Sequence, residues 1–400
     1  MFFSGKHMTG RCWRRWAAAL AVLVALGLGF GLRFGVSWDI TGDWEGLYLL
    51  ASPGKILTVT DDLFPEDADY LVTGFALSWF NKSVLAEKSD AMSGSNLIVR
   101  WNEKQGRGYV KNFYNDGRKL LINLSRFKNE EGVLSSGVFV GGGLPTGDPD
   151  SRIKDKDETG MSYFDGNRWY HIWCSVNEAV LPAWGPSKPV YPQQWRFLGS
   201  RVLENSPNNI SIVSHHWFAI DGVPLFVEKY FFYEAGDSYF TLITRVKNVG
   251  VKPVAFYYLY GDEPWVGHFG SAKGNVGWLK DGLVKTEREI DTSLNSYAGL
   301  IDYGNDLAGE SRRFSGKANF IEWDKSSRPD MAYFSNVAGR IDKTKGGKLP
   351  LNSDSCRFLG LEWGPRQLAP AQTFSFTLAI GMADNDATTG FPVKPVTTLN

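Results

Sequence analysis

The sequence predicts an all-β protein, in which a large antiparallel β-sandwich follows one N-terminal transmembrane helix. Short runs of alternating β-branched and aromatic residues recur along the chain, which is the pattern of half-buried strands. The 44 glycines and 18 prolines supply turn residues for many short connections. No amphipathic helical pattern of ordinary length accompanies them, and no repeat of about 20–50 residues is present, so solenoids and propellers are disfavoured.

The composition narrows the classes of function. The chain carries 15 Trp, 16 Tyr and 26 Phe, which suit a large β core and also a surface that stacks on sugar rings. Because 43 Lys and Arg residues balance 43 Asp and Glu residues, no nucleic-acid partner is expected. No phosphate-binding, dinucleotide-binding or zinc-protease motif is present, and the three cysteines form no CxxC motif, so no cofactor is expected.

The N-terminus predicts a membrane anchor. Arg11, Arg14 and Arg15 precede an uncharged apolar run over residues 16–32, which has about the minimum length that spans a bilayer. No small-residue cleavage signal follows, so a retained signal anchor is favoured over a cleaved signal peptide or a buried core helix. The positive-inside rule then leaves the arginines in the cytosol. The chain after about Trp38 is expected outside the cytosol, on an inner or plasma membrane that it crosses once.

Three segments are expected along the chain. Residues 1–36 hold the basic tail and the anchor, residues 37–150 form an N-terminal β-rich region, and residues 151–400 form the β-sandwich region. The stretch 137–160 is rich in Gly, Pro and acidic residues and marks the boundary. One continuous domain over residues 37–400 is the alternative.

Strand and turn signals follow one another along the outer part. Asn115-Asp116-Gly117 separates two alternating arms and predicts a hairpin over residues 106–127. The clearest predicted hairpin joins residues 238–248 to residues 254–261 across a short connection that ends in Pro253. The other predicted strands lie at residues 55–60, 70–80, 95–102, 167–176, 209–220, 224–233, 297–303, 320–323, 356–363 and 373–382.

Two segments carry a family resemblance. "YFFYEAGDSYFTLITRVKN" leads through "NVGVKPV" into a second aromatic strand that ends at Gly261, and "FLGLEWGPRQLAPAQTFSFTLAIGM" ends at Met382. Over residues 209–382 this strand pattern resembles the galactose mutarotase-like super-sandwich. The resemblance implies a sugar-facing domain with a histidine acid after the strand that ends at Gly261 and a glutamate base on a late strand. The late strand carries Glu362, and the histidine would be His268, or else His215 or His216.

The stretch "GDEPWVGHFG" is the first candidate site from the residues themselves. Acid/base chemistry on a sugar needs carboxylates or imidazoles near the reacting oxygen, so Asp262, Glu263 and His268 are candidate catalytic groups beside Glu362. Pro264 favours a loop, in which adjacent carboxylates can face one ligand. A solvated acidic turn is the alternative interpretation.

Aromatic residues and a histidine complete the candidate site. Trp265 and Trp278 flank the acidic stretch, and Trp184 lies in a Pro-rich segment that also contains Trp169, Trp173 and Trp195. Such rings can contact a sugar or be buried under a loop. His216 is a candidate substrate contact, although one histidine of the adjacent pair with His215 is expected in the core. The acidic segment 148–158 is diluted by basic residues, so no metal site is expected.

The sequence therefore predicts a membrane-anchored, extracytoplasmic protein that binds or remodels a cell-envelope or extracellular glycan. If it is an enzyme, it would be of the acid/base epimerase, lyase or hydrolase type. The alternative is a non-catalytic envelope scaffold or assembly factor that contacts a protein partner.

Overall fold

The computed structural model describes twelve stretches of the chain: residues 46–52, 55–60, 91–93, 97–124, 160–173, 176–184, 188–262, 266–267, 275–302, 315–336, 351 and 358–399. The chain divides into two compact units, residues 1–83 and residues 84–400. Apart from two short 3₁₀ turns, Pro192–Gln194 and Lys325–Ser327, all regular structure in these stretches is β-strand. The predicted all-β class is therefore confirmed for the described residues.

The first unit contributes one antiparallel pair, β1 (Gly46–Ser52) with β2 (Lys55–Thr60). The second strand coincides with the strand predicted at residues 55–60. The predicted anchor, residues 16–32, lies outside the described residues. In the described part of the chain, no helix has both the length and the apolar character needed to cross a membrane.

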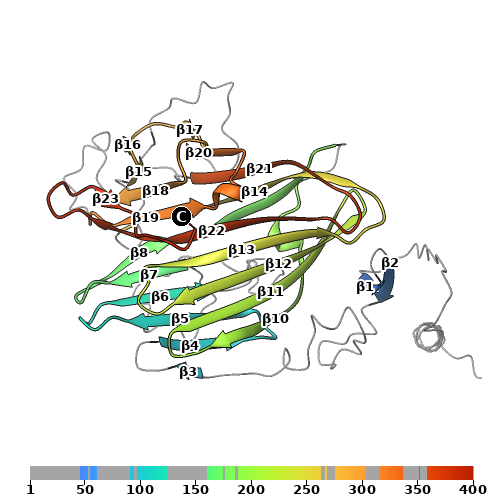
Figure 1. The fold of residues 1–400 in the computed structure, drawn as a ribbon, viewed down its shortest axis with the longest axis horizontal. Coiled ribbons are helices and arrows are strands. Elements are labelled where there is room, and N and C mark those ends of the chain that lie inside the picture. The colour runs from blue at the N-terminus through green and yellow to red at the C-terminus, as the bar shows by residue number, and fades with distance from the viewer. Residues whose placement is uncertain are drawn as a thin grey trace, which may run out of the picture. The chain divides into compact units, whose positions relative to one another are not determined.

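The second unit begins with a six-stranded antiparallel sheet whose strands follow chain order (Figure 1). The hairpin predicted over residues 106–127 is confirmed, because Phe113 pairs with Lys119 and Gly117 adopts a φ of 87° in the turn. The predicted boundary at residue 150 lies outside the described residues, and strands on either side of it pair in this one sheet. The strands are β3 (Ala91–Ser93), β4 (Leu97–Asn102), β5 (Arg107–Phe113), β6 (Lys119–Leu124), β7 (Gly160–Phe164) and β8 (Trp169–Trp173).

A ten-stranded sheet forms the largest element of the same unit. Its order is β10-β11-β12-β13-β22-β19-β18-β15-β16, and β23 pairs beside β22. The strands are β10 (Arg196–Asn205), β11 (Asn209–Ile220), β12 (Val223–Glu234), β13 (Tyr239–Asn248), β15 (Asn275–Leu279), β16 (Gly282–Val284), β18 (Tyr297–Asp302), β19 (Ala318–Trp323), β22 (Thr373–Asn385) and β23 (Pro392–Val393).

A five-stranded sheet, in the order β17-β20-β21-β14-β9, packs against it. Trp363 of β21 stacks on Phe376 of β22 at 4.0 Å between ring centroids, and Tyr258 of β14 meets the same ring edge-on at 5.2 Å. The faces that meet are called the inward faces below, and the opposite faces the outward faces. The strands are β9 (Val176–Pro182), β14 (Val254–Asp262), β17 (Arg288–Ile290), β20 (Met331–Ser335) and β21 (Phe358–Leu368).

The predicted hairpin between residues 238–248 and 254–261 is wrong. Both strands exist, but β13 pairs with β12 and β22, whereas β14 pairs with β21 and β9. The connection crosses from one sheet to the other, because each strand buries its own apolar face against the opposite sheet. The alternating pattern identifies a strand without identifying its partner.

Asn248 fixes this crossing connection. Its Nδ2 donates hydrogen bonds to the carbonyl oxygens of Lys252 at 2.8 Å and Leu368 at 3.0 Å. Its Oδ1 accepts one from the backbone N–H of Gly250 at 2.8 Å. One buried amide thereby satisfies three backbone groups of the connection and of the neighbouring strand end.

The C-terminal tail, residues 386–399, covers part of the outward face of the ten-stranded sheet. Phe391 meets Trp278 edge-on at 6.2 Å between ring centroids. Lys394 Nζ lies 2.7 Å from Glu322 Oε2, and the Thr397 hydroxyl donates to the same oxygen at 2.5 Å. Because Glu322 is only 1% exposed, these two contacts tether the tail to a buried carboxylate. The result is a second, smaller core on this face.

Candidate functional site

The predicted acidic cluster, Asp262, Glu263 and His268, can be located only through the described residues that flank it. Asp262 ends β14, where its backbone pairs with Val176 and Leu359. The side chain of Asp262 and all of Glu263, Trp265 and His268 lie outside the described residues, so their roles stay predictions. Two flanking residues are held firmly: Gly267 bridges to His171 of β8, and both backbone groups of Val266 bond the Asn275 side chain.

Glu362 lies on the outward face of the five-stranded sheet. It alternates with Leu361 and Trp363, which pack inward, and its cross-strand partners are Leu259 and Met331. Its side chain is buried, with 5% exposed.

Neither described histidine of the implied pair shares a face with Glu362. His216 lies on the inward face of the ten-stranded sheet, where its Nε2 is 2.6 Å from the Ser214 hydroxyl. His215 lies on the outward face of that sheet, 3.8 Å from a carboxylate oxygen of Glu228. The five-stranded sheet therefore separates Glu362 from both. The acid/base pair implied through His215 or His216 is not assembled, because strand alternation and sheet stacking place the groups on different faces.

The predicted sugar-contacting residues divide by burial. Trp278 is fully buried, and its Nε1 donates to the Asn319 carbonyl at 2.9 Å, so no ring face is open to a sugar. His216 is also fully buried. Trp184, in the bend after β9, is 54% exposed and can contact a ligand. In the same segment Trp173 and Trp195 are core residues, which bears out the alternative of burial for these two rings.

A buried polar network links the two sheets. Glu178 of β9 forms an ion pair with Lys229 of β12 and accepts a hydrogen bond from the Tyr258 hydroxyl. Burial lowers the pKa of Lys229, against the opposing effect of the Glu178 charge, and burial together with that charge raises the pKa of Tyr258. Lys229 also lies 5.1 Å from the centre of the Trp195 ring. Because these side chains are almost completely excluded from solvent, the network joins the sheets and offers no ligand access.

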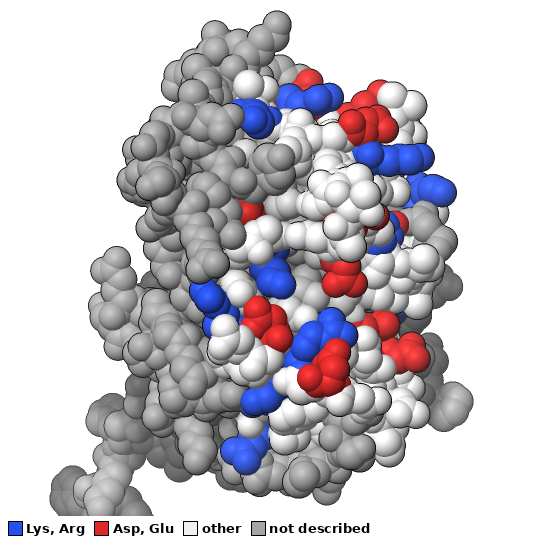
Figure 2. All heavy atoms as spheres, turned by 90° about the vertical axis from the view of Figure 1, so that its left-hand side faces the viewer, with Lys and Arg blue, Asp and Glu red and all other residues white. Residues whose placement is uncertain are grey.

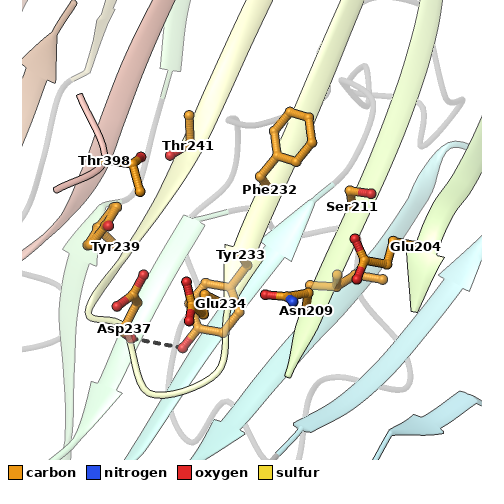
Figure 3. Close-up of a pocket in the computed structure, with 11 residues that line it drawn as sticks. Glu204, Asn209, Ser211, Phe232, Tyr233, Glu234, Asp237, Tyr239, Thr241 and Thr398 are labelled. Carbon is orange, nitrogen blue, oxygen red and sulfur yellow. Dashed lines mark hydrogen bonds between the residues drawn. The ribbon is translucent and has the colours of Figure 1, made fainter. Parts of the chain in front are cut away.

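An open hollow lies elsewhere, on the outward face at one end of β10, β11, β12 and β13 (Figure 3). It encloses about 280 Å³. One row of cross-strand partners crosses its floor and comprises Glu204, Ser211, Phe232 and Thr241. Asn209 and Glu234 form a neighbouring pair, Asp237 comes from the β12–β13 turn, Tyr239 is the first residue of β13, and Thr398 comes from the C-terminal tail.

Hydrogen bonds from two tyrosines hold the β12–β13 turn, which carries Asp237. The hydroxyl groups of Tyr114 and Tyr233 both donate to the carbonyl oxygen of Asp237, each at 2.8 Å. Burial and the nearby Glu234 charge raise the pKa of the Asp237 carboxyl. Burial and the Asp237 charge raise the pKa of Tyr239. The hollow is therefore an acidic environment on a well-supported turn.

Aromatic side chains continue from the hollow along β12. Phe232 is 37% exposed, and its ring lies nearly parallel to that of Tyr230, with centroids 6.4 Å apart and an 11° interplanar angle. The Arg245 guanidinium lies 4.9 Å from the centre of the Tyr230 ring. The Tyr230 hydroxyl donates to Glu228 at 3.0 Å. This arrangement gives a partly exposed aromatic surface beside the hollow.

None of the hollow residues was predicted from the sequence as a site. One signal was present in "KYFFYEAGDSYF": alternation along a strand places Tyr230, Phe232 and Glu234 on one face, next to an acidic turn. The hydroxyl and amide groups come from β11, β13 and the tail, and only the tertiary structure brings them together. Figure 2 shows a face on which described basic and acidic side chains are interspersed, with no large patch of one sign.

The fold and this hollow define a β-sandwich protein with an aromatic, acidic surface site. No family model and no curated protein matches the chain. A provisionally assigned aldose 1-epimerase from Escherichia coli K12 is similar to the chain at 12% identity, with 73% of this chain and 97% of that chain covered and a TM-score of 0.32. A GH36 alpha-galactosidase from Geobacillus stearothermophilus is similar at 11% identity, with 72% and 41% covered and a TM-score of 0.35.

A TPR-domain containing protein from Parabacteroides distasonis is also similar, at 11% identity, with 74% of this chain and 50% of that chain covered and a TM-score of 0.34. The chain thus spans half or less of two of these three proteins. TM-scores of this size carry no argument about function.

Proposed function

We propose that this protein binds a glycan outside the cytosol, and that the hollow at the end of β10–β13 is where the glycan binds. The observation that carries the proposal is the combination of a partly exposed ring, Phe232, with several hydrogen-bonding side chains around one open concavity. Ligand sites combine apolar and aromatic lining with a few convergent polar groups. A sugar presents both C–H faces and hydroxyl groups, so this lining suits it.

Each part of the lining has a role in this proposal. The Phe232 ring packs against the C–H face of a sugar ring. The carboxylates of Glu204, Glu234 and Asp237 accept hydrogen bonds from sugar hydroxyls, and charged acceptors make stronger bonds than neutral ones. Asn209 supplies both donors and an acceptor. The function proposed is binding; acid/base chemistry by Asp262, Glu263, His268 and Glu362 stays a prediction.

The membrane location belongs to the same proposal. The arginine-rich flank before residues 16–32 supports an anchor with a cytosolic N-terminus. Protease added to cells whose inner or plasma membrane is intact, with any outer envelope made permeable, should then degrade the second unit and spare a cytosolic marker protein. Protection of the second unit until the inner membrane is broken would contradict the proposed location.

A glycan array tests the binding proposal. Full-length protein, held in a detergent without a sugar headgroup, should bind a subset of glycans, and Phe232→Ala should abolish that binding. Trp184→Ala is the matched control, because Trp184 is also an exposed ring but does not line the hollow. Loss of binding in the Trp184 variant alone would move the site away from the hollow. Absence of binding to any glycan would favour the scaffold or assembly function.

A further inference from the structure

We infer that the ligand of the hollow is a glycan that carries protonated amino groups, such as an oligomer of glucosamine. This inference rests on the proposed function and narrows it to one substrate class. It is carried by three features of the hollow: carboxylates without a basic residue in the lining, a hydroxyl that faces the hollow without a partner among the described residues, and an exposed aromatic ring beside both.

The charge of the hollow is negative and unpaired. Glu204, Glu234 and Asp237 line it, and no Lys or Arg is among its lining residues. None of the three forms an ion pair with another described residue. The only side-chain contact of Glu204 in the described part of the chain is a hydrogen bond from the Ser206 hydroxyl at 3.3 Å. The three carboxylates therefore line one hollow without an ion-pair partner among the described residues.

Ser211 gives an observation that is independent of charge. It lies in the floor row between Glu204 and Phe232, and Figure 3 shows it on the face that the hollow occupies. Only 4% of the residue is exposed, and its hydroxyl has no hydrogen-bond partner among the described residues. The hydroxyl oxygen is not one of the buried side-chain atoms that lack a partner, so it is open toward the hollow, where a ligand group or water can bond it. A sugar hydroxyl or amine can do so.

The aromatic lining fits the same ligand. Phe232 and Tyr239 both line the hollow, and Phe232 offers the accessible ring, because it is 37% exposed whereas Tyr239 is 6% exposed. An aromatic face attracts a cation as well as sugar C–H groups, so an amino sugar uses both properties of the ring. A neutral sugar would cover carboxylates while leaving their charge uncompensated, which costs free energy. A uronic acid would add like charge and be repelled.

Titration calorimetry with three tetrasaccharides tests this inference. The probes are the glucosamine tetramer, its fully N-acetylated form and a galacturonic acid tetramer. The full-length protein should bind the glucosamine tetramer at least about tenfold more tightly than the N-acetylated form, the ratio expected when a charge-assisted contact is lost. Salt that shortens the Debye length to about 3 Å should remove most of this preference.

Variants that keep the side-chain shape but remove the charge test whether the carboxylates of the hollow cause the preference for the glucosamine tetramer. Glu204→Gln and Glu234→Gln should each weaken binding of the glucosamine tetramer about tenfold and change binding of the N-acetylated tetramer little. Asp281→Asn, an exposed acid in the turn between β15 and β16, is the matched control and should change neither. Ser211→Ala should weaken binding of both neutral and amino tetramers, because its hydroxyl acts independently of charge.

The outcomes separate the inference from the proposed function. Equal or tighter binding of the N-acetylated or uronic acid tetramer, with wild-type affinity in the two Gln variants, overturns the inference and leaves glycan binding standing. Binding of spermidine but of no tetrasaccharide and of no glycan on the array shows a cation site without a sugar and overturns both. Absence of binding to all three tetrasaccharides, with other glycans bound on the array, also overturns the inference alone.

Discussion

Lys229 shows at the residue scale how this fold accommodates a charge in its core. The ammonium group is fully buried and is neutralised by Glu178, which also accepts from Tyr258. A buried ion pair of this kind adds little stability compared with an apolar pair. Removing one partner is nevertheless costly, because it leaves the other charge buried without a counter-charge. The network therefore specifies how β9 and β12 face each other, and its members should be strongly coupled.

We predict that Lys229→Met destabilises the protein by about 3–5 kcal/mol, because it leaves the Glu178 carboxylate buried without a cation. The double variant Lys229→Met with Glu178→Gln should recover a large part of this loss. Urea unfolding followed by tryptophan fluorescence measures both. A double variant as unstable as the sum of the two single variants would contradict the coupling.

Two buried histidines predict a pH dependence of stability. Burial lowers the pKa of His171 to about 3, and burial together with the Arg201 charge lowers the pKa of His215 to about 4. Both imidazoles have a pKa near 6.5 when unfolded, so the unfolded chain binds more protons between these values. The free energy of unfolding should therefore fall as the pH drops below about 6.5, by up to about 1.4 kcal/mol per pH unit for each histidine, and the fall should level off below the folded pKa values.

The measurement is urea unfolding across this pH range. The double variant His171→Asn with His215→Asn, which cannot take up these protons, should show a shallower decline than the wild type even if it is less stable throughout. Parallel declines in the two proteins would show that other groups cause the acid sensitivity.

At the scale of elements, the C-terminal tail closes one side of the hollow and covers Trp278. Thr398 lines the hollow, and Lys394 and Thr397 hold the tail to the buried carboxylate of Glu322. The tail is thus a packed element of the fold, and its attachment supports both the stability of the sheet and the shape of the proposed binding site.

We predict that Lys394→Met lowers stability by about 3 kcal/mol, because Glu322 loses its buried counter-charge. It should also weaken glycan binding by loosening Thr398. Thermal unfolding and the calorimetric titration described above measure the two effects. Val393→Ala, an exposed change on the same tail, is the control; equal effects of the two variants would contradict a specific role for the tether.

The connection between β13 and β14 depends on Asn248. Asn248→Ala should lower the free energy of unfolding by about 2 kcal/mol or more, because it leaves buried backbone groups unpaired. Asn248→Asp should cost still more, since a carboxylate would face two carbonyl oxygens. Urea unfolding ranks the variants, and an aspartate variant as stable as the wild type would show that the amide does not fix the connection.

At the scale of the whole second unit, the sheets predict a gradient of local stability. Strands β13 and β22 lie inside the ten-stranded sheet with neighbours on both sides, whereas β16 lies at its edge. Amide hydrogen exchange should therefore be slowest in β13 and β22 and much faster in β16. Uniform protection across these three strands would contradict the gradient.

Much of the strand content was predictable, because alternation is a local signal. The strand predicted at residues 209–220 matches β11, and the strand predicted at residues 224–233 is extended by one residue at each end in β12. The Asn115-Asp116-Gly117 turn was also predictable from its own residues. Strand β10 was missed, because prolines and tryptophans before it resemble a loop. The implied pairing of Glu362 with His215 or His216 was not found for a different reason. The way that the sheets stack depends on contacts between distant segments, which a local sequence pattern does not reveal.

The sequence by itself determined the all-β class of the described part, the position of most of its longer strands and one of its hairpins, because residue alternation and turn chemistry act over a few neighbouring positions. Only the tertiary structure decided which strands pair, which aromatic rings are buried and where the hollow lies. Glu204, Ser211, Phe232 and Thr398 come from separate segments, and the burial of apolar faces between stacked sheets brings them together.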